Sequence, residues 1–179
     1  MNAGIVATRY AKAIYDFALD KKEESLVYDA FNLLINGFAQ LPQLAVVLKN
    51  PTISNTQKAE VILTACERTE NETIRKIIHL ILKNGRISDL ANIALVYTNL
   101  YRKAKGIVIA SLTSVTPVGE NETKALVSEI SKITDHQVEF HTRTDPDIIG
   151  GFILEIEDYR LDASVKDQLN RLRLDLVKN

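Results

Sequence analysis

The side chains able to do chemistry are few in this chain, and their spacing suits no catalytic or metal site. Its 179 residues include three histidines, His79, His136 and His141, and a single cysteine, Cys66. No histidine pair has the His-x3-His or His-Glu-x-x-His spacing that places two imidazoles on one zinc ion. A catalytic histidine also needs a nucleophile and an orienting group beside it, and nothing here points to them. The sequence therefore predicts no catalytic residue, no metal site and no cofactor.

The one double glycine, Gly150-Gly151, is the only candidate for a phosphate-binding loop. Such a loop follows a strand and opens a helix, whereas this pair precedes the alternating apolar segment Phe152 to Ile156. We therefore expect a structural role, in which one glycine takes a positive φ angle or lets two backbone segments approach closely. The acidic residues nearby lack the spacing of a calcium-binding loop, and we interpret them as a turn and a solvated strand face.

The bulk composition is that of an ordinary globular protein, with 46% hydrophobic and 25% charged residues. The net charge of −1 argues against a general polyanion binder. The basic pairs are not interleaved with aromatic side chains, so no nucleic-acid partner is predicted. No stretch approaches the roughly 18 apolar residues that span a bilayer, and the N-terminus lacks a signal-peptide pattern. Membrane association is expected only indirectly, through a partner.

Helical periodicity runs without interruption by strands through the first 105 residues. Ser54 with Gln57 three residues later forms a capping box that opens the fourth helix. Gly85 is a suitable C′ residue after the fifth helix, and Gly106 ends the sixth. The predicted helices are residues 3–20, 23–40, 42–49, 54 to about 68, 72–84 and about 88–105.

Beyond Gly106 the pattern changes to β-branched and alternating segments. The predicted elements are strands at 107–115, 137–142, 152–156 and 159–161, with helices at 119–134 and about 163–177. We summarise the fold class as α+β multidomain, with an N-terminal six-helix bundle (1–105) followed by a small β-α-β-β-α domain (106–179). The first domain carries a net charge of +4 and the second −5. This asymmetry suggests two different partner surfaces, although chance scatter explains it equally well.

The first predicted helix has more apolar surface than one packing contact needs. On a helical wheel its polar residues Arg9, Lys12 and Asp16 occupy only about 60° of arc, whereas an edge helix needs an apolar arc of only about 100°. The fifth helix carries a similar excess. Two interpretations remain open. Either both helices lie at the centre of the bundle, which periodicity alone favours, or a groove between them accepts an amphipathic helix from another protein.

Three segments together resemble one family. Residues 9–18, RYAKAIYDFA, resemble the opening helix of the delta subunit of bacterial F-type ATP synthases, whose mitochondrial counterpart is the oligomycin-sensitivity-conferring protein. Residues 84–87 resemble its Asn-Gly-Arg turn, and residues 145–165 resemble its C-terminal signature. The acidic start of that signature, residues 145–147, departs from the family pattern. This departure concerns one turn and does not change the resemblance to the family. The residues that carry these structural motifs include Gly85, Gly150, Gly151 and Ser164.

The resemblance implies a non-catalytic peripheral-stalk (stator) subunit on the cytoplasmic face of the cell membrane, monomeric when isolated and present in one copy per complex. In that family the helical domain grips the N-terminal helix of an alpha subunit in a groove of the first and fifth helices. The C-terminal domain contacts the b subunits, so the stalk resists rotor torque during proton-driven ATP synthesis. Carried onto this chain, the groove-lining candidates are Tyr10, Ala13, Ile14, Phe17, Ile74, Ile78 and Ile81.

Two other functions remain open on the residues alone. A small-molecule-sensing module would use the C-terminal domain as its ligand pocket, and a metabolite would then raise the melting temperature. An enzyme with its site between the domains would show a cluster of perturbed titratable groups.

Overall fold

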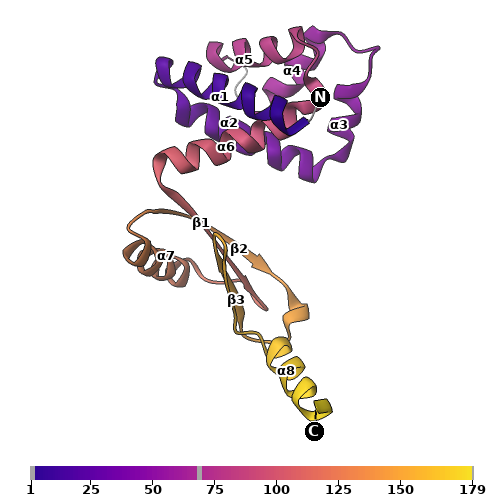
Figure 1. Ribbon diagram of the computed structural model, residues 1–179. Coiled ribbons are helices and arrows are strands. Elements are labelled where there is room, and N and C mark those ends of the chain that lie inside the picture. The colour runs from indigo at the N-terminus through magenta and orange to yellow at the C-terminus, as the bar shows by residue number, and fades with distance from the viewer. Residues whose placement is uncertain (1–2, 68–69, 179) are drawn as a thin grey trace. The chain divides into compact units, whose positions relative to one another are not determined.

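The computed structural model describes residues 3–67 and 70–178. The chain divides into two compact units, Met1–Ala104 and Lys105–Asn179, both visible in Figure 1. The fold is α+β, mostly helical with one small four-stranded sheet. Each unit is described below by itself.

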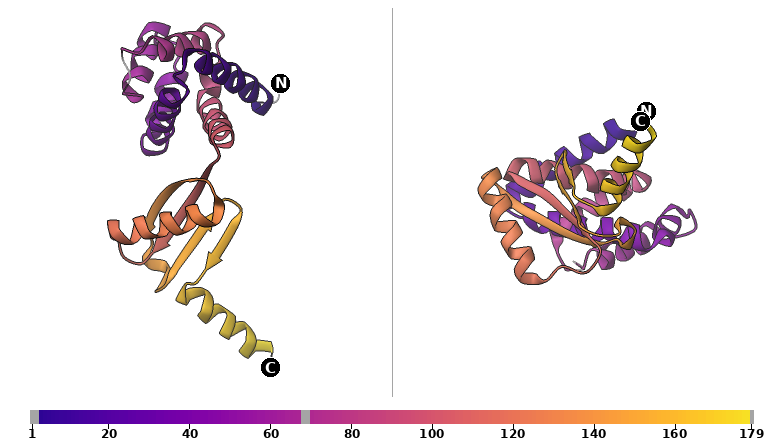
Figure 2. Two further views of the ribbon diagram at one scale, coloured as in Figure 1. Left: turned by 90° about the vertical axis from the view of Figure 1, so that its left-hand side faces the viewer. Right: turned by 90° about the horizontal axis from the view of Figure 1, so that it is seen from below.

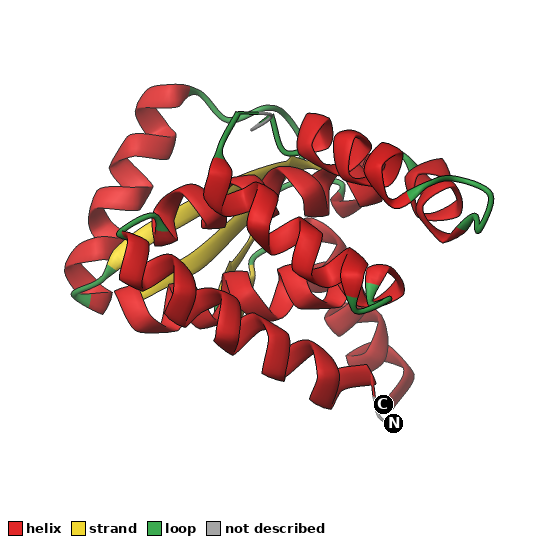
Figure 3. Ribbon diagram, turned by 90° about the horizontal axis from the view of Figure 1, so that it is seen from above, coloured by secondary structure: helices red, strands yellow, loops and turns green. Residues whose placement is uncertain are grey.

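In the N-terminal unit every regular element among the described residues is helical (Figure 3). Side chains cap the N-termini of two of these helices. Asn71 accepts a hydrogen bond from the Ile74 amide at 2.8 Å at the start of one of them. Ser54 accepts a hydrogen bond from the Gln57 amide at 3.3 Å, while the Gln57 side chain accepts one from the Ser54 amide at 3.2 Å, so the predicted capping box is confirmed. The elements are α1 (Ala3–Lys21), α2 (Glu24–Gln40), α3 (Pro42–Lys49), α4 (Asn55–Ala65), α5 (Glu72–Lys83), the 3-10 turn η1 (Ile87–Asp89) and α6 (Leu90–Lys105).

Two helix ends differ from the sequence prediction. Helix α4 ends at Ala65, because Cys66 closes its last turn and Glu67 takes a left-handed φ of 52°. The predicted end at Arg68 lies outside the described residues. Helix α6 begins at Leu90, two residues later than predicted, because the chain first forms the short turn η1.

Aromatic side chains pack together in part of the core of the N-terminal unit. The Tyr97 ring is fully buried and meets Phe31 edge to face, with ring centroids 5.1 Å apart. Its hydroxyl donates a hydrogen bond to the Glu24 carbonyl at 3.0 Å, so the buried polar end is satisfied. Nearby, Tyr28 stacks on Tyr101 at 4.4 Å. These contacts join α2 to α6, two helices far apart in the sequence.

The C-terminal unit is built around a sheet with strand order β2-β1-β3-β4. Strands β1 and β2 are parallel, and the other neighbouring pairs are antiparallel. Helix α7 makes the crossover between the parallel strands, packs against β2 and lies across the sheet (Figure 2). The elements are β1 (Ile107–Ser114), α7 (Glu120–Thr134), β2 (Gln137–Thr144), the 3-10 turn η2 (Pro146–Ile148), β3 (Phe152–Ile156), β4 (Tyr159–Asp162) and α8 (Val165–Lys178).

The predicted order β-α-β-β-α contains three strands, whereas the sheet has four. The short segment predicted at 159–161 is a full member of the sheet, strand β4, which pairs with β3 from Ile156↔Tyr159 to Ile153↔Asp162. A tight turn at Glu157 and Asp158, with Glu157 at a φ of 49°, brings the two strands together. A four-residue strand is easily undercounted, since it shows too few alternations to stand out.

One face of the sheet is only partly covered. On β1 the side chains of Val108, Ala110 and Leu112 are buried on this face. Directly paired residues share a face, so the register extends it through β3 to Tyr159 and Leu161 of β4. These two side chains keep 82% and 56% of their surface exposed. The half of the sheet farther from β2 therefore leaves apolar surface without cover among the described residues.

Candidate partner-binding surfaces

The first helix presents a mixture of buried and accessible candidates. Ile14 is buried, Tyr10 and Phe17 are half-buried, and Ala13 is exposed. Tyr10, Ala13 and Phe17 follow one another at intervals of three and four residues, so they share one side of α1. That side combines two aromatic edges with a small residue between them.

The candidates on α5 lie in the core. Ile74, Ile78 and Ile81 are at most 1% exposed, and α5 packs against α1 and α4. In this conformation these side chains offer no surface to a partner, and they hold α5 in place. The exposed apolar side chain on α5 is Leu80, at 45%, which lies off the buried stripe and only widens the apolar face.

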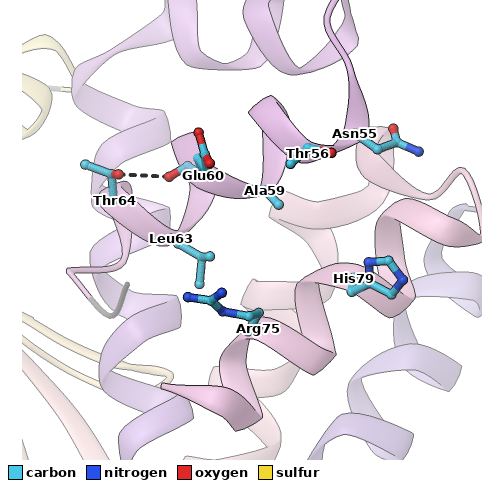
Figure 4. A pocket seen from close by; sticks show the side chains of 8 residues that line it. All are labelled: Asn55, Thr56, Ala59, Glu60, Leu63, Thr64, Arg75 and His79. Carbon is cyan, nitrogen blue, oxygen red and sulfur yellow. Dashed lines mark hydrogen bonds between the residues drawn. The ribbon is translucent and has the colours of Figure 1, made fainter. Parts of the chain in front are cut away.

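A hollow lies between α4 and α5, and no pattern in the sequence indicated it. It has a volume of about 670 Å³. Figure 4 shows the Leu63 side chain pointing from α4 toward Arg75 of α5, with His79 farther along the same helix. The lining residues are Asn55, Thr56, Ala59, Glu60, Leu63, Thr64, Arg75 and His79. Periodicity placed Ala59 and Leu63 on the inner side of α4, but only the packing of α5 leaves space beside them.

Titratable groups form no chemical site among the described residues. No group of three or more His, Cys, Asp and Glu side chains in this part of the chain lies close enough to hold a metal ion. Burial raises the pKa of the Cys66 thiol to about 12. A thiol with that pKa stays protonated at neutral pH, so it is a poor nucleophile and a poor metal ligand. The exposed Glu72 carboxylate has its pKa lowered by its hydrogen bond and ion pair with Lys76, a local helix pair at 2.9 Å.

In the C-terminal unit the glycine pair and the segment before α8 form one junction. The Val165 amide donates to the Gly150 carbonyl at 3.0 Å, and the Ala163 amide donates to the Phe152 carbonyl at 2.9 Å. Gly151 has a φ of +73°, and a Cβ there would collide with the Ala163 carbonyl. A Cβ on Gly150 would come within 2.9 Å of the Val165 side chain. Both glycines are therefore needed for close approach of the two segments.

Ser164 caps the helix that leaves this junction. Its buried hydroxyl donates to the Asp162 carboxylate at 2.6 Å and accepts from the Asp167 amide at 3.2 Å. The same carboxylate accepts from the Ser164 amide at 3.1 Å. The two hydrogen bonds from Ser164, together with the Arg160 guanidinium, lower the pKa of Asp162. The junction thus sets the direction in which α8 leaves the sheet, and Figure 1 shows α8 running away from the strands.

Helix α8 exposes most of its apolar side chains. Leu169 is 51% exposed and Leu172 60%. Helix α8 packs against η2, next to the junction. A charged pocket of about 280 Å³ beside the junction is lined by Asp145, Arg160, Asp162, Lys166 and Asp167 among others. Ligand sites are mostly apolar and usually larger, so this hollow does not favour a small-molecule sensor.

Comparison with known proteins decides the family. A family model described as "ATP synthase delta (OSCP) subunit" matches residues 6–176. The chain belongs to the ATP synthase delta (OSCP) subunit family. A protein named ATP synthase subunit delta from Azobacteroides pseudotrichonymphae genomovar. CFP2 is 44% identical over 97% of this chain and 98% of its own length. Its namesake from Bacteroides thetaiotaomicron is 38% identical over 99% and 96%.

A solved structure agrees with this family at the level of the fold. A chain in the Toxoplasma gondii mitochondrial ATP synthase hexamer aligns with a TM-score of 0.69 at 20% identity, over 96% of this chain and 97% of that one. As a delta (OSCP) family member, the protein is a non-catalytic peripheral-stalk subunit of an F-type ATP synthase. No single described helix is long and apolar enough to cross a membrane. Helices α2 and α3 reach the required length and hydropathy only as a pair, bent by 101°.

Proposed function

We propose that helices α1–α6 act as one six-helix bundle that binds the N-terminal helix of an alpha subunit, while the C-terminal unit contacts the b subunits. The protein would then join the catalytic head to the membrane-anchored stalk, at the cytoplasmic face of the cell membrane. The observation that carries this proposal is that both units of this delta (OSCP) family member leave apolar side chains exposed. A subunit with a single partner would need such a surface on one unit only.

On the N-terminal unit the proposed contact is the surface that α1 and α5 share. Tyr10 and Phe17 lie two helical turns apart and are half-buried, so each presents an aromatic edge. Ala13 lies between them and permits close approach of a second helix. Ile14 together with Ile74, Ile78 and Ile81 supports this surface from below, since these buried side chains hold the bundle in shape.

On the C-terminal unit the proposed contact includes α8 and the open half of the sheet. The exposed side chains Leu169 and Leu172 lie three residues apart on α8, so they share one side of that helix. An amphipathic helix of a b subunit would cover them. Tyr159 and Leu161 offer a second apolar patch on the same unit.

The energetics suit a link that has to stay closed under torque. Nanomolar binding corresponds to about −12 kcal/mol. Interfaces that bury about 800 Å² per partner around a few aromatic anchors reach this affinity. The net charge of +4 on residues 1–105 favours encounter with an acidic partner, chiefly through the association rate. That rate should therefore fall between low and high salt.

Calorimetry on the full chain with a synthetic alpha-subunit N-terminal peptide tests the proposal. We expect 1:1 binding to the native protein and none to Phe17→Asp, which places a charge in the apolar contact. The variant should retain its helical circular dichroism, because Phe17 is only half-buried. The matched control Leu172→Asp, on the other unit, should bind the peptide normally. Absence of binding at micromolar peptide would rule out the alpha-subunit contact.

A further inference from the structure

The loop between the η2 turn and strand β3 holds one residue in a strained backbone conformation. Ile149 has a φ of 70° and a ψ of −41°, close to the rare and strained γ-turn of positive φ. The other non-glycine residues with positive φ in the described chain are lysine, glutamate or aspartate, with φ between 49° and 58°. Ile149 is the one β-branched residue among them. A β-branched side chain at positive φ is a genuine outlier, because its two γ carbons crowd the backbone.

Contacts on both sides of Ile149 hold this conformation. Its own amide donates to the Pro146 carbonyl at 3.1 Å. The preceding side chain, Ile148, is buried at 4% exposure. The following carbonyl, that of Gly150, accepts from the Val165 amide at 3.0 Å. A strained backbone persists only where the surrounding structure fixes it in this way.

The Ile149 side chain contributes little to the fold. It keeps 61% of its surface exposed, so burial offsets only part of the strain. Glycine adopts positive φ without strain, and the chain has glycine at position 151, where φ is +73°. The fold alone therefore favours glycine at position 149 as well. An exposed apolar side chain held at such a position indicates a contact with another molecule.

Ile149 lies next to the beginning of the apolar side of α8. A Cβ added to Gly150 would come within 2.9 Å of the Val165 side chain, so Val165 packs directly against this glycine. Val165, Leu169 and Leu172 recur at intervals of four and three residues and share one side of α8. Their side chains are 36%, 51% and 60% exposed. Ile149 is thus one residue away from the end of the apolar side that the proposed function assigns to a b subunit.

We propose that Ile149 is an anchor residue for the b-subunit helix that covers α8. The inference rests on the proposed contact between α8 and a b subunit, and it adds a residue that lies outside that helix. The partner helix lies along Val165, Leu169 and Leu172, and its apolar face also covers Ile149. Because hydrogen bonds already fix the loop in the free chain, little conformational freedom is lost when the partner binds.

Calorimetry with the full chain and the soluble part of the b subunits tests the proposal, together with thermal unfolding of the chain alone. Ile149→Gly should weaken binding about tenfold, because it removes the anchor. It should not lower the melting temperature, because it relieves the strain. Loss of affinity without loss of stability is the signature of a side chain that serves a partner. Ile149→Leu, which supplies an apolar side chain without β-branching, should restore most of the affinity.

Two further variants make the test specific. Ile133→Ala is the matched control, since Ile133 is an isoleucine of the same unit, on α7, with 82% exposure. It should leave the affinity for the b subunits unchanged. Leu172→Asp should abolish binding, because it places a charge in the proposed α8 contact.

Full affinity of Ile149→Gly, or an equal loss of affinity in Ile133→Ala, would overturn the anchor role. A lower melting temperature of Ile149→Gly would overturn it too, since the side chain would then serve the fold. If Leu172→Asp lost binding while Ile149→Gly bound fully, the anchor would be wrong and the proposed α8 contact would stand. If the native chain did not bind the b subunits at all, the proposed contact itself would fail, and this inference with it.

Discussion

The helical unit has a core of fully buried large side chains, whereas the α/β unit leaves several of its large apolar side chains uncovered. Tyr97, Phe31 and Leu34 of the helical unit are fully buried, while Phe152 and Tyr159 on the sheet keep 40% and 82% of their surface exposed. The largest fully buried side chains of the described chain all lie between Ile14 and Tyr97. Hydrophobic stabilisation scales with buried apolar area. The helical unit therefore gains more stability from buried apolar side chains than the α/β unit does.

Removing a core aromatic should produce the largest difference between the units. Phe31→Ala should lower the free energy of unfolding of the helical unit by about 3–5 kcal/mol, because it leaves a cavity in a closed core. Tyr159→Ala should change the α/β unit by less than about 0.5 kcal/mol, as a surface substitution. Urea unfolding followed by hydrogen exchange, resolved to each unit, measures both. If the two variants lost similar unfolding free energies, the two units would not differ in how far they depend on buried side chains.

The junction before α8 should be the most sensitive point of the α/β unit. Gly151→Ala should cost about 2–4 kcal/mol, because alanine is strained at positive φ and its Cβ meets the Ala163 carbonyl. Gly85→Ala is the control, since Gly85 also has a positive φ of 64° but nothing lies within 4 Å of an added Cβ. It should cost only about 1–2 kcal/mol. If denaturant titrations gave equal losses of unfolding free energy for the two variants, the close approach of Gly151 to Ala163 would not contribute to stability.

Alkaline pH should weaken the helical unit selectively. The Cys66 thiol has a pKa of about 12 in the folded chain, against about 8.5 when unfolded. Between these values the unfolded chain releases a proton that the folded chain keeps. Stability is therefore fully present below about pH 8.5 and falls above it, by up to about 1.4 kcal/mol per pH unit.

A Cys66→Ala variant isolates this contribution. It should show a flatter decline of unfolding free energy between about pH 9 and 10, before Tyr97, whose pKa burial also raises, contributes in the same direction. Urea titrations at several pH values provide the slopes. Identical slopes for the variant and the native chain would mean that Cys66 ionises normally in the folded state.

Loss of the helix cap should have the smallest effect. Ser164→Ala removes the hydroxyl that accepts from the Asp167 amide and should destabilise α8 by about 1 kcal/mol. Faster amide exchange in the first turn of α8, with β1 and α6 unchanged, is the expected signature. Ser128→Ala, at an exposed position within α7, should cause no loss because alanine is the better helix former.

Local signals in the sequence predicted much of the fold. The Ser54–Gln57 capping box, the bounds of α3 and the start of β1 were all correct, because neighbouring residues determine them through hydrogen bonds and backbone preference. The end of α4, where Glu67 takes a positive φ, and the 3-10 turn η1, which packs against α1 and α3, were not predicted. The summary of the sheet missed β4, whose four residues are defined mainly by pairing with β3.

For the candidate surfaces, the sequence by itself determined which side chains are apolar and how they recur along α1 and α5. It did not determine which neighbour covers them. Tertiary packing buried Ile14, Ile74, Ile78 and Ile81, left Tyr10 and Phe17 at the edge, and opened a groove beside Leu63. Periodicity is a property of one helix, whereas exposure depends on the helices packed around it. The sequence therefore determines the apolar face of each helix, and the contacts between helices determine which part of that face stays exposed.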